Sequence, residues 1–417
     1  MTPIQPPAVA YNTLVVAAGV ASVGFAAGVV GCLALLRKRP LVGDAAAHAT
    51  LLGVAGAFLA SGRRDVPTLL VGALVSAVAG LVALVLVRRF TRTRDDAATA
   101  VVIGVSFGAG VAVLSGITAR GLPGGAGLEQ FLLGHTAALT ARDALMLAAV
   151  SGLTLMLVAA AFKEAITVAF DAAFAAATGW PVTFIDVAIV CLVAVMVVAG
   201  LPAAGAVLVT ALVVIPPVAA RQWTDHAATL LALAGVVGLV AALVGVAVSA
   251  VAPRLPTGPL VVLAAATLCA VSFLAAPQRG WLARRSAERA MLRQWLRGAA
   301  LDRVLRAEEG GAAGAAAEVI VSAAGAGSAR CRRVAEGVWL ELVRREELVP
   351  AAGAAGLWRL SGAGRSAALE RRRRVAEWRM ILESAPEAAR EGLTLDIPAP
   401  EAVLDAGLVA ALCSGKG

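Results

Sequence analysis

The sequence predicts an all-α, polytopic membrane protein of about nine transmembrane helices, with a smaller charged domain at its C-terminal end. The 417 residues are 60% hydrophobic, and their mean hydropathy of +0.85 is too apolar for one soluble globule. Apolar runs of about 18 residues or more recur through residues 1–276, which is the pattern of membrane-spanning helices. Residues 277–417 then hold 22 of the 36 basic and 17 of the 27 acidic residues. We therefore expect a membrane domain at 1–276 and a cytoplasmic extension at 277–417.

Nine apolar runs are expected to cross the membrane, because a helix rising 1.5 Å per residue needs about 20 residues for a core of about 30 Å. The first run lacks a basic region and a cleavage pattern before it, so it is expected to be retained. The segment 126–140 is too short to span and is expected to be re-entrant or interfacial; its His135 fits a loop better than a metal site. The predicted spans are 12–36, 42–61, 66–87, 97–117, 143–162, 183–200, 203–220, 227–250 and 256–276.

Glycine is frequent, with 43 residues, many of them at small-residue spacing within the spans. Two interpretations remain open for any one of them. Small residues allow transmembrane helices to approach closely, but an Ala- and Gly-rich composition produces the same spacing without any packing role.

Basic residues predict the orientation of the chain, because cytoplasmic loops carry an excess of Lys and Arg. The clusters at 37–39 and 88–94, together with Lys163 and Arg221, fall on one side if the spans alternate. That side is expected to be cytoplasmic. The N-terminus is then outside, and the ninth span delivers the C-terminal extension to the cytoplasm.

Two ionisable residues stand inside the second predicted span, in LVGDAAAHATLLGVAGAFLASG. Asp44 and His48 are four residues apart, so a helix places them on one face. Ionisable groups inside a span are costly and usually face a cavity, a partner or a transported ion. A carboxylate with an imidazole suits Mn²⁺, Fe²⁺ or Zn²⁺. A structural Asp–His pair, or an interfacial Asp44 beside the basic cluster, would explain the same residues.

The segment FKEAITVAFDAAFAAATGWP, residues 162–181, joins the fifth and sixth spans on the predicted cytoplasmic side. It places Lys163, Glu164 and Asp171 among alanines and phenylalanines. A short amphipathic helix at the membrane surface buries one face and presents the other to a cytosolic partner. A simple connecting helix would have the same pattern.

Two kinds of motif are missing from the sequence, a phosphate-binding loop and paired cysteines. Its only lysines are Lys38, Lys163 and Lys416, and none stands in a phosphate-binding G-x-x-x-x-G-K-[ST] loop. The five cysteines form no C-x-x-C pair, so neither a disulfide framework nor a thiolate metal site is indicated. If transport is driven by ATP, hydrolysis is expected on a separate chain; the resemblance described next implies a transport subunit and not an enzyme.

Several stretches resemble the permease subunits of the manganese/zinc/iron-type ABC importers, over roughly residues 10–276. The Asp44 segment is similar to the family's Gly-Asp-Ala-x-x-His-Ala segment, with Leu52 where the family commonly has proline. Further similar stretches are FKEAITVAFDAAFAAATGW, AGAVLVTALVVIPPVAARQW and, more weakly, LPTGPLVVLAAATL. The resemblance implies a metal pathway at Asp44 and His48. It implies an ATPase-coupling helix that includes Lys163, Glu164, Phe170, Asp171 and Gly179.

The resemblance also implies the partners and the location. They are a cytoplasmic ATP-binding subunit, an extracytoplasmic metal-binding protein, and a second permease subunit, identical or related, in the lipid of a bacterial inner membrane. No cofactor is expected to be bound permanently; manganese, iron or zinc is cargo. Two alternatives stay open: an ion-coupled secondary transporter with Asp44 and His48 as a proton relay, and a membrane-anchored regulator.

The C-terminal extension is expected to contain helices at 285–309 and 330–348, followed by a strand, a turn, a strand and a basic helix. Helices before a small hairpin are the order of a winged helix, and this part resembles the winged-helix domain of iron/manganese-dependent repressors. The chain has no histidine after His226, so the histidine metal ligands of those repressors are missing. The run Arg371–Arg374 could contact DNA phosphate, form a solvated helix face, or contact anionic lipid and the ATPase; DNA is the least expected. Apolar positions predicted to be buried are Leu292, Leu296, Val304, Val338, Leu342 and Leu348.

Overall fold

The computed structural model divides into two compact units, residues 1–282 and 283–417, each treated by itself below. The predicted short segment at 126–140 with its His135 lies almost entirely outside the described residues. The structure describes residues 7–62, 65–92, 94–120, 139–251, 255–277, 279–318, 329–353 and 355–384.

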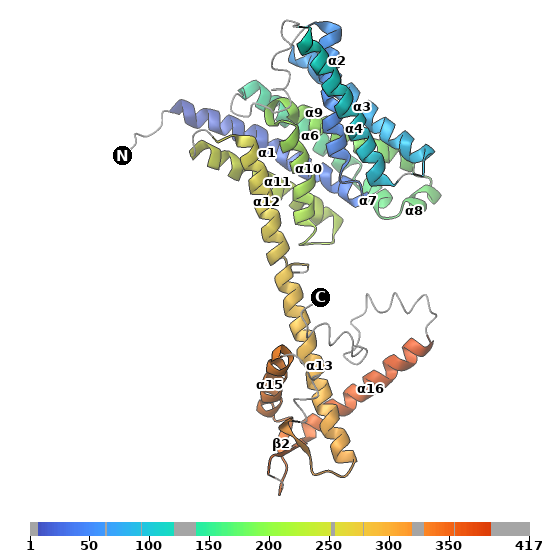
Figure 1. Cartoon of the computed structure of the whole chain (residues 1–417), viewed down its shortest axis with the longest axis vertical. Coiled ribbons are helices and arrows are strands. Elements are labelled where there is room, and N and C mark those ends of the chain that lie inside the picture. Colours follow the sequence, from blue (N-terminus) through green and yellow to red (C-terminus); the bar gives the residue numbers. More distant parts are fainter. Residues whose placement is uncertain are drawn as a thin grey trace. The chain divides into compact units, whose positions relative to one another are not determined.

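Every regular element in the described residues of the first unit is a helix (Figure 1). Local sequence explains several helix starts: the Asp65 carboxylate accepts a hydrogen bond from the Thr68 amide, and Thr140 with Asp143 forms a capping box. The helices are α1 (Pro7–Leu36), α2 (Val42–Ser61), α3 (Val66–Phe90), α4 (Asp95–Ala119), α6 (Ala141–Ala160), α7 (Phe162–Phe170), α8 (Ala172–Ala177), α9 (Val182–Ala204), α10 (Ala206–Ala220), α11 (Ala227–Val251) and α12 (Thr257–Ala275).

The described residues contain eight helices that are long and apolar enough to cross a membrane, and the predicted span 203–220 corresponds to a helix that is too short for this criterion. The exception is α10, which has 15 residues and is about 22 Å long at 1.5 Å per residue. Gly205, with φ +76°, separates it from α9, and Pro216 and Pro217 lie near its other end. Helix α10 contacts α1, α2, α9, α11 and α12. It is therefore a short helix buried among the others.

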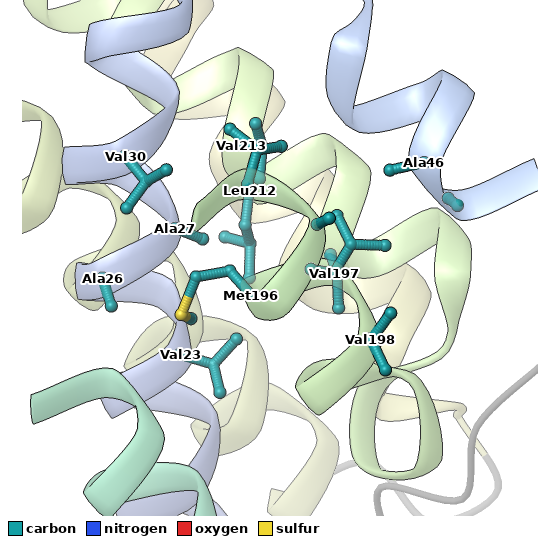
Figure 2. Packing of buried hydrophobic residues seen from close by; sticks show 14 of the residues in the cluster. Val23, Ala26, Ala27, Val30, Ala46, Met196, Val197, Val198, Leu212 and Val213 are labelled. Carbon is teal, nitrogen blue, oxygen red and sulfur yellow. The ribbon is translucent and has the colours of Figure 1, made fainter. Parts of the chain in front are cut away.

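The helices of the first unit form two groups that share one core. Helices α2, α3 and α4 pack together, while α1 packs against α6, α9, α10 and α11. These neighbours lie side by side in Figure 1. Figure 2 shows part of the core, where Met196 of α9 points toward α1 and Leu212 of α10 lies next to it. Side chains at these contacts are small, mostly alanine and valine, so the backbones come close.

The described residues of the second unit form three helices and a small antiparallel sheet: α13 (Trp281–Glu309), β1 (Ala315–Ala316), α15 (Ala329–Arg344), β2 (Leu348–Pro350), β3 (Leu357–Leu360) and α16 (Gly362–Ser384). The strand order is β1-β3-β2. Helix α15 ends four residues before the predicted 348, and Glu346, with φ +55°, lies in the turn that leads into β2. The predicted strand, turn, strand and helix are confirmed, and all six apolar positions named above are buried.

Candidate functional site

Asp44 and His48 lie together on one face of α2. Asp44 stands in the first turn, where the positive end of the helix favours a carboxylate. Its Oδ1 is 3.4 Å from Nε2 of His48. Most other residues of this part of α2 are buried, but the two side chains remain 41% and 39% exposed. The pair is therefore only partly enclosed by the helices of its own chain.

The surroundings of His48 are open and mostly apolar. Its ring meets Phe107 of α4 edge-on, with ring centroids 5.2 Å apart. Leu52 and Gly56 continue the half-exposed line at the same spacing of four, and a Cβ at Gly56 would have no neighbour within 4 Å. The shared face predicted from the spacing of the two polar residues is thus part of an accessible stripe along α2, formed by Asp44, His48, Leu52 and Gly56.

Asp44 and His48 are the two potential metal ligands on this stripe. Among the described residues, no three His, Cys, Asp or Glu side chains are grouped closely enough to hold a metal ion. His226, outside the stripe, is exposed at the start of α11. A carboxylate oxygen and an imidazole nitrogen suit divalent transition metals, but a stable zinc-type site uses four ligands. This arrangement can bind such an ion weakly or share it with other donors.

The segment after α6 is broken where a single helix was predicted at 163–180. Asp171 is extended between α7 and α8, with φ −143°. Its Oδ1 accepts hydrogen bonds from the amides of Ala173 and Phe174, at 3.0 and 2.9 Å. Aspartate favours this position because its carboxylate satisfies free amides at a helix start. The predicted coupling helix is therefore two short helices joined at Asp171.

The outer surface of this segment is aromatic. Phe170 and Phe174 are 65% and 58% exposed, and Lys163 is also exposed. Glu164, by contrast, turns inward, and its Oε2 is buried without a hydrogen-bond partner. Exposed phenylalanines beside a charged residue make a surface that a protein partner can cover.

Gly179 ends α8 for a backbone reason. Its φ is +88°, a conformation that side chains disfavour. The amide of Trp180 bonds the carbonyl of Ala175, at 3.0 Å, and the Gly179 amide bonds that of Ala176, at 3.1 Å. This is the Schellman arrangement of a helix C-terminus. The glycine is needed to turn the chain into α9.

A buried ionic cluster joins α7 to the start of α9, and the sequence interpretation missed it. Arg37 donates from Nη2 to Oδ2 of Asp186, at 2.6 Å, and from Nη1 to the Val168 carbonyl, at 2.5 Å. Arg39 approaches the same carboxylate oxygen at 3.5 Å. The two arginines were interpreted as orientation signals and as possible neighbours of Asp44, not of Asp186. The available signal was Asp186 itself, an acidic residue inside the apolar run VTFIDVAIV.

The run Arg371–Arg374 in the second unit is largely neutralised within its own chain. Arg372 donates to Asp302 and Glu309 of α13. Burial raises the pKa of the Asp302 carboxyl, but hydrogen bonds from Arg372 and Arg306 outweigh it and lower that pKa below its ordinary value. Ion pairs of the run include Arg372–Asp302, Arg373–Glu377 and Arg374–Glu370. These ion pairs stabilise α16 and its contact with α13.

Comparison with known proteins identifies the first unit. Residues 10–276 match the ABC 3 transport family. The chain belongs to this family. Similar ABC 3 relatives include the manganese transport system membrane protein MntC of Bacillus subtilis, 37% identical over 66% of this chain and 63% of the relative. The zinc transport system membrane protein TroC of Treponema pallidum is 38% identical over 65% of this chain and 91% of the relative. The chain thus spans less than two thirds of MntC but most of TroC.

The fold agrees with this membership. The solved structure of PsaBC from Streptococcus pneumoniae in complex with Fab aligns with a TM-score of 0.56 and 25% identity, over 65% of this chain and 94% of that one. ABC 3 membership and eight spans make the chain a multi-pass protein of the plasma membrane. The family resemblance, and the expectation of a transport subunit that is not an enzyme, are confirmed. The ABC 3 match ends at residue 276, before the second unit.

Proposed function

We propose that this chain is the permease subunit of an ATP-binding cassette importer for divalent transition metal ions. The observation that carries the proposal is the Asp44–His48 pair, 3.4 Å apart and half-exposed on a membrane-spanning helix. Charged or titratable groups are retained there at a cost of a few kcal/mol, which points to a transported ion. Relatives named for manganese and zinc transport support a metal of this class.

A two-ligand site fits transport better than storage. Asp44 and His48 supply one oxygen and one nitrogen, so an ion keeps room for water and for other donors. A second permease subunit, facing the same stripe, would contribute another pair and complete a site on the shared axis. The ion is then held by four protein groups in transit and released when the subunits move apart.

The partners follow from the same arrangement. The exposed Phe170 and Phe174 offer the α7–α8 surface to a cytoplasmic ATP-binding subunit. The hydrogen bond from Arg37 to Val168 brings the basic cluster at 37–39 to the side of α7, which supports a cytoplasmic position for both. The N-terminus is then outside, where an extracytoplasmic metal-binding protein delivers the ion.

The second unit is proposed to be a cytoplasmic domain of the winged-helix type, with its boundary near residue 277. Helices before a two-stranded hairpin and the antiparallel order β1-β3-β2 support it. DNA binding is disfavoured because Arg372, Arg373 and Arg374 already pair with carboxylates. The unit is expected to contact the ATPase or anionic lipid.

The test is ATP-dependent uptake by the complex reconstituted in proteoliposomes, comparing Mn²⁺, Fe²⁺ and Zn²⁺. His48→Ala removes the imidazole and leaves the carboxylate alone, so uptake of the transported ion should fall by about tenfold or more. His226→Ala, which changes an exposed histidine outside the stripe, is the matched control and should transport normally.

Two results would contradict the proposal. Unchanged uptake in His48→Ala would contradict the assignment of His48 to the metal pathway. Uptake that needs no ATP-binding subunit and collapses with the proton gradient would instead support a secondary transporter with the same two residues as a proton relay.

A further inference from the structure

The Arg37–Asp186 cluster lies where three helices meet. Arg37 follows α1 directly, Val168 belongs to α7, and Asp186 stands in the second turn of α9. The planar guanidinium donates in two directions at once, to a backbone carbonyl and to a carboxylate. A single ammonium presents one compact charge and lacks this fork. Arg37 therefore holds α7 and α9 in one geometry.

The cluster is shielded from solvent. The side chains of Arg37 and Asp186 are 14% and 16% exposed, and Nε of Arg37 and Oδ1 of Asp186 are buried without partners. The adjoining cavity, lined also by Val42 and Val193, has a volume of about 10 Å³, so it has room for one water at most. Breaking such a pair strands a buried charge, which is strongly unfavourable. The helices that the Arg37–Asp186 pair joins are therefore expected to move together.

The same cluster reaches the start of α2. Arg39 lies 3.5 Å from the Asp186 carboxylate, and α2 begins three residues later. A Cβ at Gly43 would lie 3.2 Å from Val213 of α10 and 3.6 Å from Val193 of α9. The first turn of α2 is thus packed on α9 and α10, directly before Asp44. A shift of α9 changes the position of the metal-pathway residues.

We propose that Arg37 is a positioning residue, which links the α7–α8 surface to the first turn of α2 through Asp186. The inference rests on the proposed function and deepens it. When the ATP-binding subunit moves α7, the bond to Val168 carries that movement to Arg37, and the ion pair carries it to α9. The start of α2 follows through Arg39 and the contacts of Gly43. Metal binding at Asp44 and His48 is thereby coupled to ATP hydrolysis.

The test measures metal ions transported per ATP hydrolysed by the assembled transporter in proteoliposomes, using whichever of Mn²⁺, Fe²⁺ and Zn²⁺ the wild type takes up. Arg37→Lys keeps a positive charge but loses the fork, and Asp186→Asn removes the carboxylate charge. Both should lower the ratio by about tenfold, which is within the range for one element that couples two sites. The matched control is Asp225→Asn, in the exposed Arg279–Asp225 pair of 2.7 Å, which should keep the wild-type ratio.

Each outcome bears on the inference. Uptake and hydrolysis that fall in proportion, or a ratio unchanged in Arg37→Lys, overturns it. If Asp186→Asn does not assemble, as size-exclusion chromatography of the complex would reveal, Arg37→Lys alone decides. A wild-type complex without ATP-driven uptake of Mn²⁺, Fe²⁺ or Zn²⁺ contradicts the proposed function, whereas normal wild-type uptake with fully coupled variants contradicts only the role of Arg37.

Discussion

Helices α1 and α11 cross at a pair of glycines, and this contact gives a quantitative prediction. A Cβ at Gly238 would lie 2.1 Å from the carbonyl oxygen of Gly24, and one at Gly24 would lie 2.6 Å from that of Gly238. The neighbouring atoms are backbone, so no side chain can rotate away. Of the two interpretations of glycine in this sequence, close packing applies here.

The predicted perturbation is Gly238→Ala. An ordinary contact between carbon and a carbonyl oxygen is about 3.3 Å, so the helices must separate by about 1 Å at the crossing. Such overpacking costs about 1–3 kcal/mol, and the better helix propensity of alanine returns up to about 1 kcal/mol. We expect a net loss of about 1–2 kcal/mol in the free energy of unfolding.

The matched control is Gly152→Ala in α6, where a Cβ would have no neighbour within 4 Å. Only the propensity term applies there, so stability should stay equal or rise by up to about 1 kcal/mol. The assay is thermal unfolding of the full chain in detergent, with near-UV circular dichroism as the readout. Equal melting temperatures for Gly238→Ala and the wild type would refute the close crossing, and so would equal losses in both variants.

Three further predictions concern α8 and the second unit. Asp171→Ala should reduce ATPase-coupled uptake because the α8 cap is lost, at a cost of about 1 kcal/mol. Asp171→Asn keeps a capping side chain and should transport normally. Lower uptake in Asp171→Asn than in Asp171→Ala would show that the charge matters. The pKa of Asp302 is lowered in the fold, so its stabilisation is fully present above the ordinary value of 3.8 and is lost as pH falls through the lower folded value. At neutral pH, Asp302→Asn should speed hydrogen exchange in α16 of the full chain. The expected loss of local stability is about 1 kcal/mol, because solvent screens the half-exposed Arg372. Unchanged exchange would show that the Arg372–Asp302 pair does not stabilise α16. Leu342→Ala should cost about 2–5 kcal/mol because Leu342 is fully buried, and a similar stability to wild type would mean that this core is not formed.

The candidate site was partly predictable. The spacing of Asp44 and His48 gave their shared face, because helical periodicity is a local property of the chain. The break at Asp171 was not foreseen, although aspartate is a strong N-cap. The surrounding run of alanines and phenylalanines continues the helical pattern on both sides, and only the hydrogen bonds to Ala173 and Phe174 reveal where the helix restarts.

The sequence by itself determined that the chain is a polytopic membrane protein, where eight of its spans lie, and which family it belongs to. Hydropathy over about 20 residues is enough for this, since each span satisfies its own backbone hydrogen bonds. The tertiary structure decided the features that depend on contacts between residues far apart in the sequence. Helix α10 is apolar like the spans, but its length is limited by Gly205 and it is enclosed by five helices. Arg37 and Asp186 are 149 residues apart, and only packing brings their charges together.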